Sequence, residues 1–350
     1  QPLFLTAAAA VLMVAPAYGH HSDAALNMDT TLTLEGTVTE FSLRNPHAYF
    51  VMTVAGEDGQ AQDWTVQMGS MITLRRRGWS PDSLQVGDQV TASLHPARDG
   101  RLYGLVTTVE KDGKEIGTQV PGETQRGFRV GADVPRATSV EGRWIVDRSS
   151  LPPDYPGGLD QITLRDLRLT ERGRLAMSSW TQDLPDNPEL NCIAKPTPAM
   201  IIYTDLYPIE FTDNGDDTLT IRSQYFDELR TVYMDGRAHP DATVLMHEGH
   251  SVGHYEGDTL VIDTRNFAAH RSPYQNGIPS GSQKHVIERY RLIDDGVRME
   301  VEFLLEDPEY IVGSMTHKRI LFYRPDTNMD PFNCDLESTR RYLPSNLSSE

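Results

Sequence analysis

Histidines at two places in the chain have the chemistry to bind a metal ion. His20 and His21 follow an apolar stretch in which Ala17 and Gly19 occupy the two positions that a signal peptidase reads. Cleavage after Gly19 would leave His20 with a free α-amino group beside its imidazole, a chelating pair suited to copper. His47, in the motif NPH, is a third candidate nitrogen. The alternative is a solvated terminus, with His47 in a hydrogen-bonded turn.

The segment HEGHSVGH brings His247, His250 and His254 together in the sequence. It departs from the HExxH motif of metallohydrolases, which needs histidines four residues apart on one helix. Its glycines predict a β-hairpin, and on a strand His250 and His254 share a face because side chains alternate with period two. They could meet His239 or His270 at a metal or substrate in a barrel mouth, or hydrogen-bond across strands and line a solvated rim.

The segment RTVYMDGRAHP surrounds a turn with charged side chains. We expect Asp235 to bond its own backbone and Gly236 to supply a positive φ. Arg230 and Arg237 offer partners for a bidentate Asp–Arg brace. The functional alternative makes His239 and Asp235 an acid–base couple, for which the sequence identifies no target group.

The two cysteines, Cys192 and Cys334, are predicted to form one disulfide in an oxidising compartment. Closing so long a loop is worth about 4 kcal/mol by loop-entropy reasoning. A zinc site is less favoured, because no CxxC or Cys-His pair accompanies the cysteines. The sequence contains no P-loop, dinucleotide fingerprint, G-x-S-x-G elbow, haem motif or EF-hand, which excludes the commonest cofactor classes.

Composition and the N-terminal apolar run set the expected location. The run from Leu3 to Ala15 has the length of a signal-peptide core, so residues 1–19 are either a cleaved signal peptide or a retained signal anchor. The net charge of −18 argues against nucleic-acid binding, and the only basic cluster is Arg75-Arg76-Arg77. We expect a periplasmic protein tethered to the inner membrane.

The first half predicts a small barrel over residues 20–115. Three alternating strands, a helix-like segment ending at Gly78 and two further strands follow the element order of an OB-type Greek-key barrel. The expected strands are Thr31–Leu43, His47–Ala55, Gln62–Met68, Gln89–His95 and Leu102–Glu110. Residues 116–138 are rich in Gly, Pro and polar residues and predict a linker.

Residues 139–350 predict a larger barrel. Nine short strands with hairpin turns and almost no helical periodicity favour an antiparallel, lipocalin-like β-barrel, so the chain is expected to be all-β. The expected strands are Gly142–Asp147, Pro208–Thr212, Leu219–Gln224, Leu229–Met234, Ser251–Tyr255, Thr259–Thr264, His285–Ile293, Arg298–Leu305 and Ile320–Arg324.

Two resemblances accompany these patterns. HHSDAA, TLEGTVTEFSLRNPHAYFVMTV and MGSMITLRRRGWSPDSLQVGDQVT resemble a family of secreted bacterial domains of unknown function, over roughly residues 20–115. RTVYMDGRAHP, GHSVGHYEGDTLVIDT and VIERYRL resemble an uncharacterised β-rich region of exported bacterial proteins. Neither resemblance implies an activity or a catalytic residue.

Two function classes follow from the sequence. The first is a non-catalytic, membrane-tethered periplasmic accessory or scaffold subunit of a larger membrane protein complex, conceivably a photosynthetic or respiratory electron-transfer assembly. The second is a free periplasmic small-molecule-binding protein, metal-binding protein or enzyme that uses a barrel pocket. In the first class the histidines are structural and no cofactor is expected; in the second, copper or zinc would bind among His20, His21, His47, His250 and His254.

Overall fold

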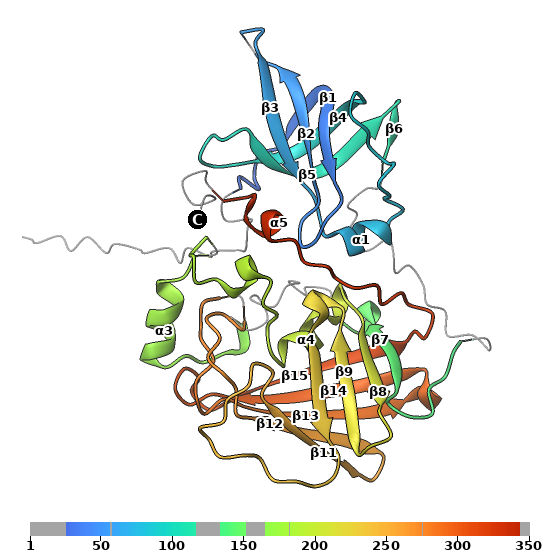
Figure 1. The fold of residues 1–350 in the computed structure, drawn as a ribbon, viewed down its shortest axis with the longest axis vertical. Coiled ribbons are helices and arrows are strands. Elements are labelled where there is room, and N and C mark those ends of the chain that lie inside the picture. The colour runs from blue at the N-terminus through green and yellow to red at the C-terminus, as the bar shows by residue number, and fades with distance from the viewer. Residues whose placement is uncertain are drawn as a thin grey trace, which may run out of the picture.

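The computed structural model describes residues 26–56, 58–116, 134–151, 165–181, 183–274 and 276–343. The predicted leader, His20, His21 and most of the predicted linker lie outside these ranges. Across the described ranges, no helix is both long and apolar enough to cross a bilayer. Two β-barrels lie one above the other along the long axis, with α1 (Met71–Arg75) and α5 (Leu336–Arg340) between them (Figure 1).

The first barrel has the predicted OB-like topology. Its neighbour order is β3-β2-β1-β4-β5, and a parallel β3–β5 pairing closes it, with α1 between β3 and β4. The sheet adds the short β6 after β5. The strands are β1 (Leu32–Ser42), β2 (Tyr49–Ala55), β3 (Ala61–Gln67), β4 (Gln89–Pro96), β5 (Tyr103–Lys111) and β6 (Lys114–Glu115).

Helix α1 packs against both barrels. The Ser70 side chain caps it by accepting from the Thr73 backbone N–H, and the chain leaves the turn at Gly78, whose φ of +89° favours glycine. Leu74 packs into the core of the first barrel, whereas Ile72 joins the core of the second. One short helix therefore contributes an apolar side chain to each barrel.

The second barrel closes with nine strands in chain order, one more than the eight of a lipocalin. Neighbours pair antiparallel as predicted, except that β10 and β11 run parallel at Val232 and Tyr233. The strands are β7 (Gly142–Val146), β8 (Ile209–Asp213), β9 (Thr218–Ser223), β10 (Leu229–Tyr233), β11 (His250–Glu256), β12 (Thr259–Arg265), β13 (His285–Ile293), β14 (Arg298–Glu306) and β15 (Ser314–Tyr323).

Connecting segments close one end of the second barrel, which we term the capped end. The chain leaves this end after β7 and returns at β8, and it leaves again after β12 and returns at β13. The first connection carries α3 (Glu171–Ser178), the 3-10 helix η4 (Pro188–Asn191) and α4 (Ala199–Ile202), whose four residues are all buried in the barrel core. These helices are too short for the sequence to show helical periodicity.

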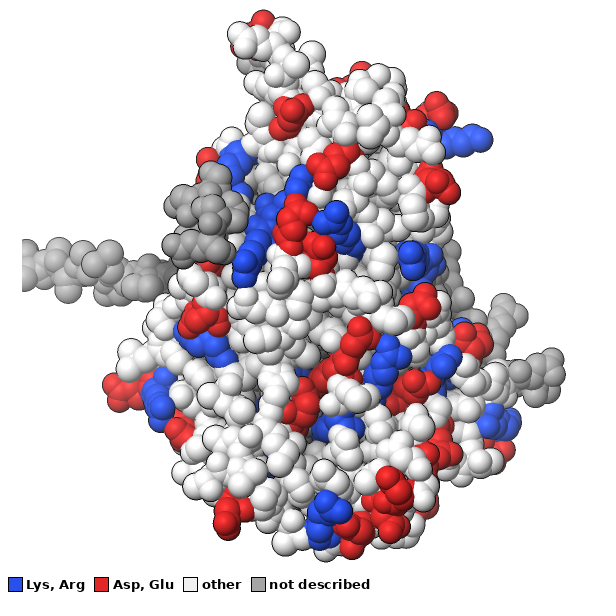
Figure 2. Space-filling model, in the orientation of Figure 1, with Lys and Arg blue, Asp and Glu red and all other residues white. Residues whose placement is uncertain are grey.

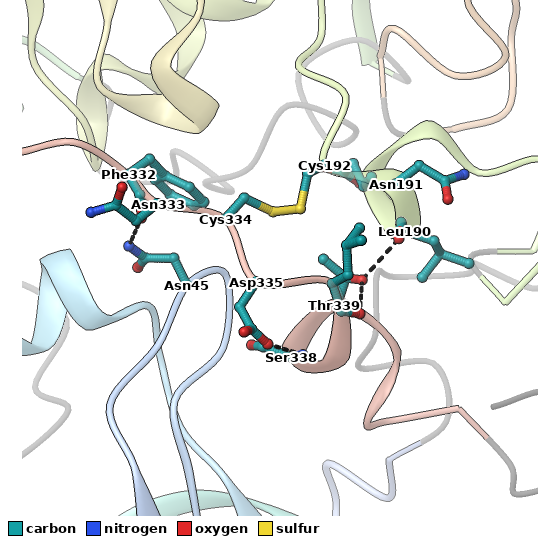
Figure 3. The surroundings of a disulfide bond; sticks show 12 residues. Asn45, Leu190, Asn191, Cys192, Phe332, Asn333, Cys334, Asp335, Ser338 and Thr339 are labelled. Atoms are coloured by element: carbon teal, nitrogen blue, oxygen red, sulfur yellow. Dashed lines mark hydrogen bonds between the residues drawn. A yellow bond between two sulfur atoms is a disulfide. The ribbon is translucent and has the colours of Figure 1, made fainter. Parts of the chain in front are cut away.

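The C-terminal strap, residues 330–343, joins the two barrels. The Asp335 N–H donates to the Asn45 carbonyl at 2.8 Å, and the Thr339 hydroxyl donates to the Leu190 carbonyl at 2.9 Å. The predicted disulfide, Cys192–Cys334, fixes the strap to the end of η4 with a Cα–Cα distance of 5.8 Å (Figure 3). The strap therefore contacts the first barrel on one side and the capped end on the other.

Candidate functional site

In the first barrel, the face that corresponds to the ligand-binding face of OB folds contacts the chain's own C-terminal strap. OB folds bind ligands on the face of strands 2 and 3. Here the Arg341 guanidinium lies 3.7 Å from the centroid of the Tyr49 ring, and Arg101 donates to the Tyr342 carbonyl at 2.9 Å. Only a small, shallow cleft remains there, lined by His47, Tyr49, Thr65, Gln67, Tyr103, Ser338 and Arg341. The chain's own strap thus contacts this face where β2 begins.

His47 belongs to that contact. Its backbone N–H donates to the Ser338 hydroxyl at 3.1 Å, and its ring lies edge-on to Tyr342 at 6.3 Å. Burial lowers the pKa of His47 to about 4, so the ring is neutral at physiological pH. The structure gives His47 a place in the domain interface, far in the fold from the outer face of β11.

The histidines of HEGHSVGH fall into different environments. His250 and His254 share the outer face of β11, as period two requires, but His254 is exposed and contacts Glu256 at 3.3 Å. His250 meets His239 at 3.0 Å between Nδ1 atoms. His247 and His270 both hydrogen-bond the Ala194 carbonyl in the cap. The segment enters a β-strand at His250, as the sequence predicted.

The turn at Asp235 agrees with the sequence in part. Asp235 accepts from the Arg237 guanidinium and backbone, and Gly236 has a φ of +74°. His239 does not pair with Asp235, because its Nε2 contacts Asp263 at 3.0 Å. Arg230 was expected beside this turn, and that expectation is wrong. It is 1% exposed inside the barrel, because it alternates with outward-facing Leu229 on β10.

The barrel interior contains a buried ion pair. Arg230 Nη2 lies 2.7 Å from Glu288 Oε2, and both side chains are at most 1% exposed. The Thr197 hydroxyl donates to the other oxygen of Glu288, and Arg230 also donates to Thr264 at 3.3 Å. Burial acts to lower the pKa of Arg230, but Glu288 raises it above its ordinary value. The pair is therefore held by three side-chain hydrogen bonds, although Arg230 Nε has no partner among the described residues.

Four further ionisable side chains gather at the capped end, together with one tyrosine. Each charged residue adjoins a strand terminus on that side: Glu228 precedes β10, Lys284 precedes β13 and Asp307 follows β14. The register His285↔Glu306 brings the positions of Lys284 and Asp307 together. Glu248 comes from the segment entering β11. We call Glu228, Glu248, Tyr274, Lys284 and Asp307 the rim cluster.

Lys284 is the centre of the rim cluster. It is 1% exposed, and its ammonium lies 4.2 Å from the centroid of Phe267 and 5.4 Å from that of Tyr274. Burial lowers the pKa of Lys284 to about 7, although the surrounding carboxylates, that of Asp307 first, act to raise it. A lysine in this environment exists in both protonation states near neutral pH.

The acidic members of the cluster have shifted pKa values too. Burial, reinforced by the charge of Glu248, holds the pKa of Glu228 well above its usual range. Burial also raises the pKa of Asp307, whose Oδ2 accepts from the Gly281 N–H at 2.7 Å. Such shifts concentrate at functional sites, although structural networks also produce them.

Six polar atoms of the cluster have no hydrogen-bond partner among the described residues: Lys284 Nζ, Asp307 Oδ1, the Tyr274 hydroxyl, Glu248 Oε2 and both carboxylate oxygens of Glu228. Each unpartnered buried group costs about 1–3 kcal/mol. A bound polar ligand or a buried water molecule that hydrogen-bonds these atoms would remove that cost.

Sequence reasoning missed the rim cluster because its members are far apart and each lies beside an ordinary turn. Lys284 was the one available signal, because it directly precedes a strand whose alternate residues are buried. Recognising it requires the register of β13 and β14 and the closure of the barrel, neither of which a single sequence contains. In the described ranges no three His, Cys, Asp or Glu side chains gather to hold a metal ion.

Comparison with known proteins covers the first barrel. No curated protein matches the chain significantly. The second barrel has no family match, so its resemblance to exported bacterial regions stays a prediction. Residues 9–107, which include most of the first barrel, match the model of a family of unknown function (DUF6152).

Proposed function

We propose that the second barrel binds a small polar molecule at the rim cluster. This is a form of the second function class above, a protein that uses a barrel pocket. The observation that supports this most is the set of unpartnered atoms on Lys284, Asp307 and Tyr274, all at the capped end. Small-molecule sites commonly lie in barrel mouths and combine aromatic walls with a few convergent polar groups. Phe267 and Tyr274 supply the aromatic walls here.

The cluster defines the chemistry of its ligand. Lys284 offers a donor, Asp307 offers an acceptor and the Tyr274 hydroxyl can do either. A ligand with adjacent donor and acceptor groups would satisfy all three atoms at once. Arg230 and Glu288 offset each other's charge, so this pair is not needed to match the charge of the ligand.

Thermal shift measurements with a panel of small polar compounds test the proposal. The panel contains amino acids, sugars, polyols and short carboxylic acids. A true ligand at 100 times its Kd should stabilise the protein by about 2.7 kcal/mol and raise the unfolding temperature. Lys284→Met and Asp307→Asn should abolish that rise, whereas Lys318→Met, on the exposed side of β15, should retain it. Equal responses of all four proteins would reject the site.

A second proposal retains the membrane-tethered accessory subunit. Its support is the loop tip of Val244, Leu245 and Met246, whose exposed fractions are 45%, 46% and 38%. The Asn266 side chain donates to the carbonyls of Asp241 and Val244 at 3.0 and 3.1 Å, so the tip is held in one conformation. A rigid apolar tip loses little entropy on docking. On the face shown in Figure 2, acidic and basic side chains are interspersed, which suits a protein partner better than nucleic acid.

Membrane fractionation and native purification test this second proposal. The protein should sediment with inner membranes and co-purify with a membrane complex. Val244→Ser with Leu245→Ser should release it from the complex, whereas the same change at exposed Val86, on the first barrel, should not. Recovery of the protein without substitutions as a free protein in the periplasmic fraction would contradict the accessory role.

A further inference from the structure

Two imidazoles meet on the outer surface of the second barrel, away from the rim cluster. His250 lies on the outer face of β11, and His239 reaches it from the β10–β11 connection. Their Nδ1 atoms are 3.0 Å apart, and the ring planes are inclined at 76°. His250 is 6% exposed, and its other face stacks on Tyr233 at 5.0 Å. Both rings are therefore held in position by packing.

A carboxylate stands behind one of the rings. His239 Nε2 lies 3.0 Å from Asp263 Oδ1, and His285 Nε2 lies 3.0 Å from Asp263 Oδ2. A carboxylate at Nε2 favours the proton there, which leaves the Nδ1 lone pair of His239 available either to accept a hydrogen bond from His250 or to bind a metal ion. The same carboxylate–histidine arrangement supports metal-ligating histidines in known metal sites.

The nitrogen spacing selects among metals. Two metal–nitrogen bonds of about 2.0–2.1 Å that subtend roughly a right angle place the nitrogens about 3 Å apart. A tetrahedral angle would separate them further, so adjacent positions of a square-planar or tetragonal site fit better, and that geometry is typical of Cu(II). Two arginines lie near the histidine pair, and the positive charge of each is offset by an ion-pair partner. Arg237 pairs with Asp235, and Arg265 pairs with Asp263.

We propose that His239 and His250 form a Cu(II) site through their Nδ1 atoms, with Asp263 orienting His239. Water would take the remaining positions, since the described residues offer no third ligand here. The site is independent of the rim cluster and of the ligand proposed for it. The proposed site differs from the metal ligands expected from the sequence, because His254, on the same face of β11, does not belong to the site.

Copper titration of the full chain tests the site. His20→Gln and His21→Gln form the background, so that no terminal chelate competes. One equivalent of CuSO₄ should bind in the presence of glycine as competitor, with an electron paramagnetic resonance spectrum of a tetragonal site carrying two imidazole nitrogens. His239→Gln or His250→Gln should weaken binding at least 100-fold, and Asp263→Asn should weaken it about 10- to 100-fold.

His254→Gln is the matched control, since it removes an exposed imidazole from the same strand and face. It should leave affinity and spectrum unchanged. The proposal is wrong if His254→Gln weakens binding as much as His250→Gln does. It is equally wrong if the background protein binds no copper, because the 3.0 Å contact is then an ordinary N–H···N hydrogen bond. Circular dichroism of each variant establishes that it is folded.

Discussion

Lys284 should make the stability of the second barrel depend on pH, and Lys284→Met should remove that dependence. The folded protein holds the pKa of Lys284 at about 7 because the side chain is buried, whereas an unfolded lysine titrates near 10.5. Below about pH 7 both states carry the proton. Between pH 7 and 10.5 the unfolded state binds a proton that the folded state lacks, so the free energy of unfolding rises with pH in this window.

The magnitude follows from the two pKa values. Their difference is 10.5 − 7, or about 3.5, and each unit corresponds to about 1.4 kcal/mol, which gives about 5 kcal/mol over the whole window. Over the accessible range from pH 7 to 9.5 we expect the wild type to gain about 3 kcal/mol relative to Lys284→Met. Groups that do not interact with Lys284 cancel in this difference, whereas Glu228 and Asp307, whose pKa values Lys284 lowers, do not.

Urea unfolding at half-unit pH steps, followed by circular dichroism, measures the difference. Lys318→Met is the control, because Lys318 is half exposed and Glu300 raises its pKa. That variant should show no such gain between pH 7 and 9.5. A difference between wild type and Lys284→Met that stays constant with pH would show that the folded protein keeps Lys284 ionised, and the reasoning about the rim cluster would fail.

Three further predictions concern stability, each measured by denaturant unfolding. Replacing Cys192 and Cys334 by serine opens a loop of 142 residues. The free energy of unfolding should fall by up to about 5 kcal/mol, and proteolysis of the strap should become faster. A loss below about 1 kcal/mol would contradict the loop argument. Glu288→Gln leaves Arg230 buried without its counter-charge and should cost about 3–5 kcal/mol, whereas no loss would mean that the pair is solvated. Gly296 and Gly257 both have a positive φ, +80° and +64°, but a Cβ at Gly296 would meet the Ala137 carbonyl, whereas a Cβ at Gly257 would lie in open space. Gly296→Ala should therefore destabilise the protein far more than Gly257→Ala. Equal costs would refute the packing argument.

The strand pattern could be predicted because most strands have one buried and one solvated face. β13 was predicted to the residue, and its buried residues alternate regularly with more exposed ones. The first half of β15 was missed because His317 and Arg319 point inward there and interrupt the apolar alternation. The parallel β10–β11 pairing was also missed, because the sequence indicates strands and turns but not which strands a long connection brings together.

The functional residues were predicted less well, for a different reason. His239 and His250 are near in sequence, so their meeting was among the possibilities that the spacing suggested. Lys284 and Asp307 become neighbours only through the β13–β14 register, and their burial depends on the connections that cap the barrel. The disulfide was predicted from the two cysteines alone, but the sequence does not show which elements it joins. The strap it holds also bonds Asn45 of the first barrel.

Native mass spectrometry of the intact protein, purified from its own host without denaturation, tests the proposed binding function most directly. The wild type should carry an additional non-covalent mass of a small polar molecule above the polypeptide with one disulfide. Lys284→Met, purified identically, should lack that mass, and Lys318→Met should keep it. The polypeptide mass alone in the wild type, or the same adduct on the wild type and on Lys284→Met, would contradict a ligand site at the rim cluster.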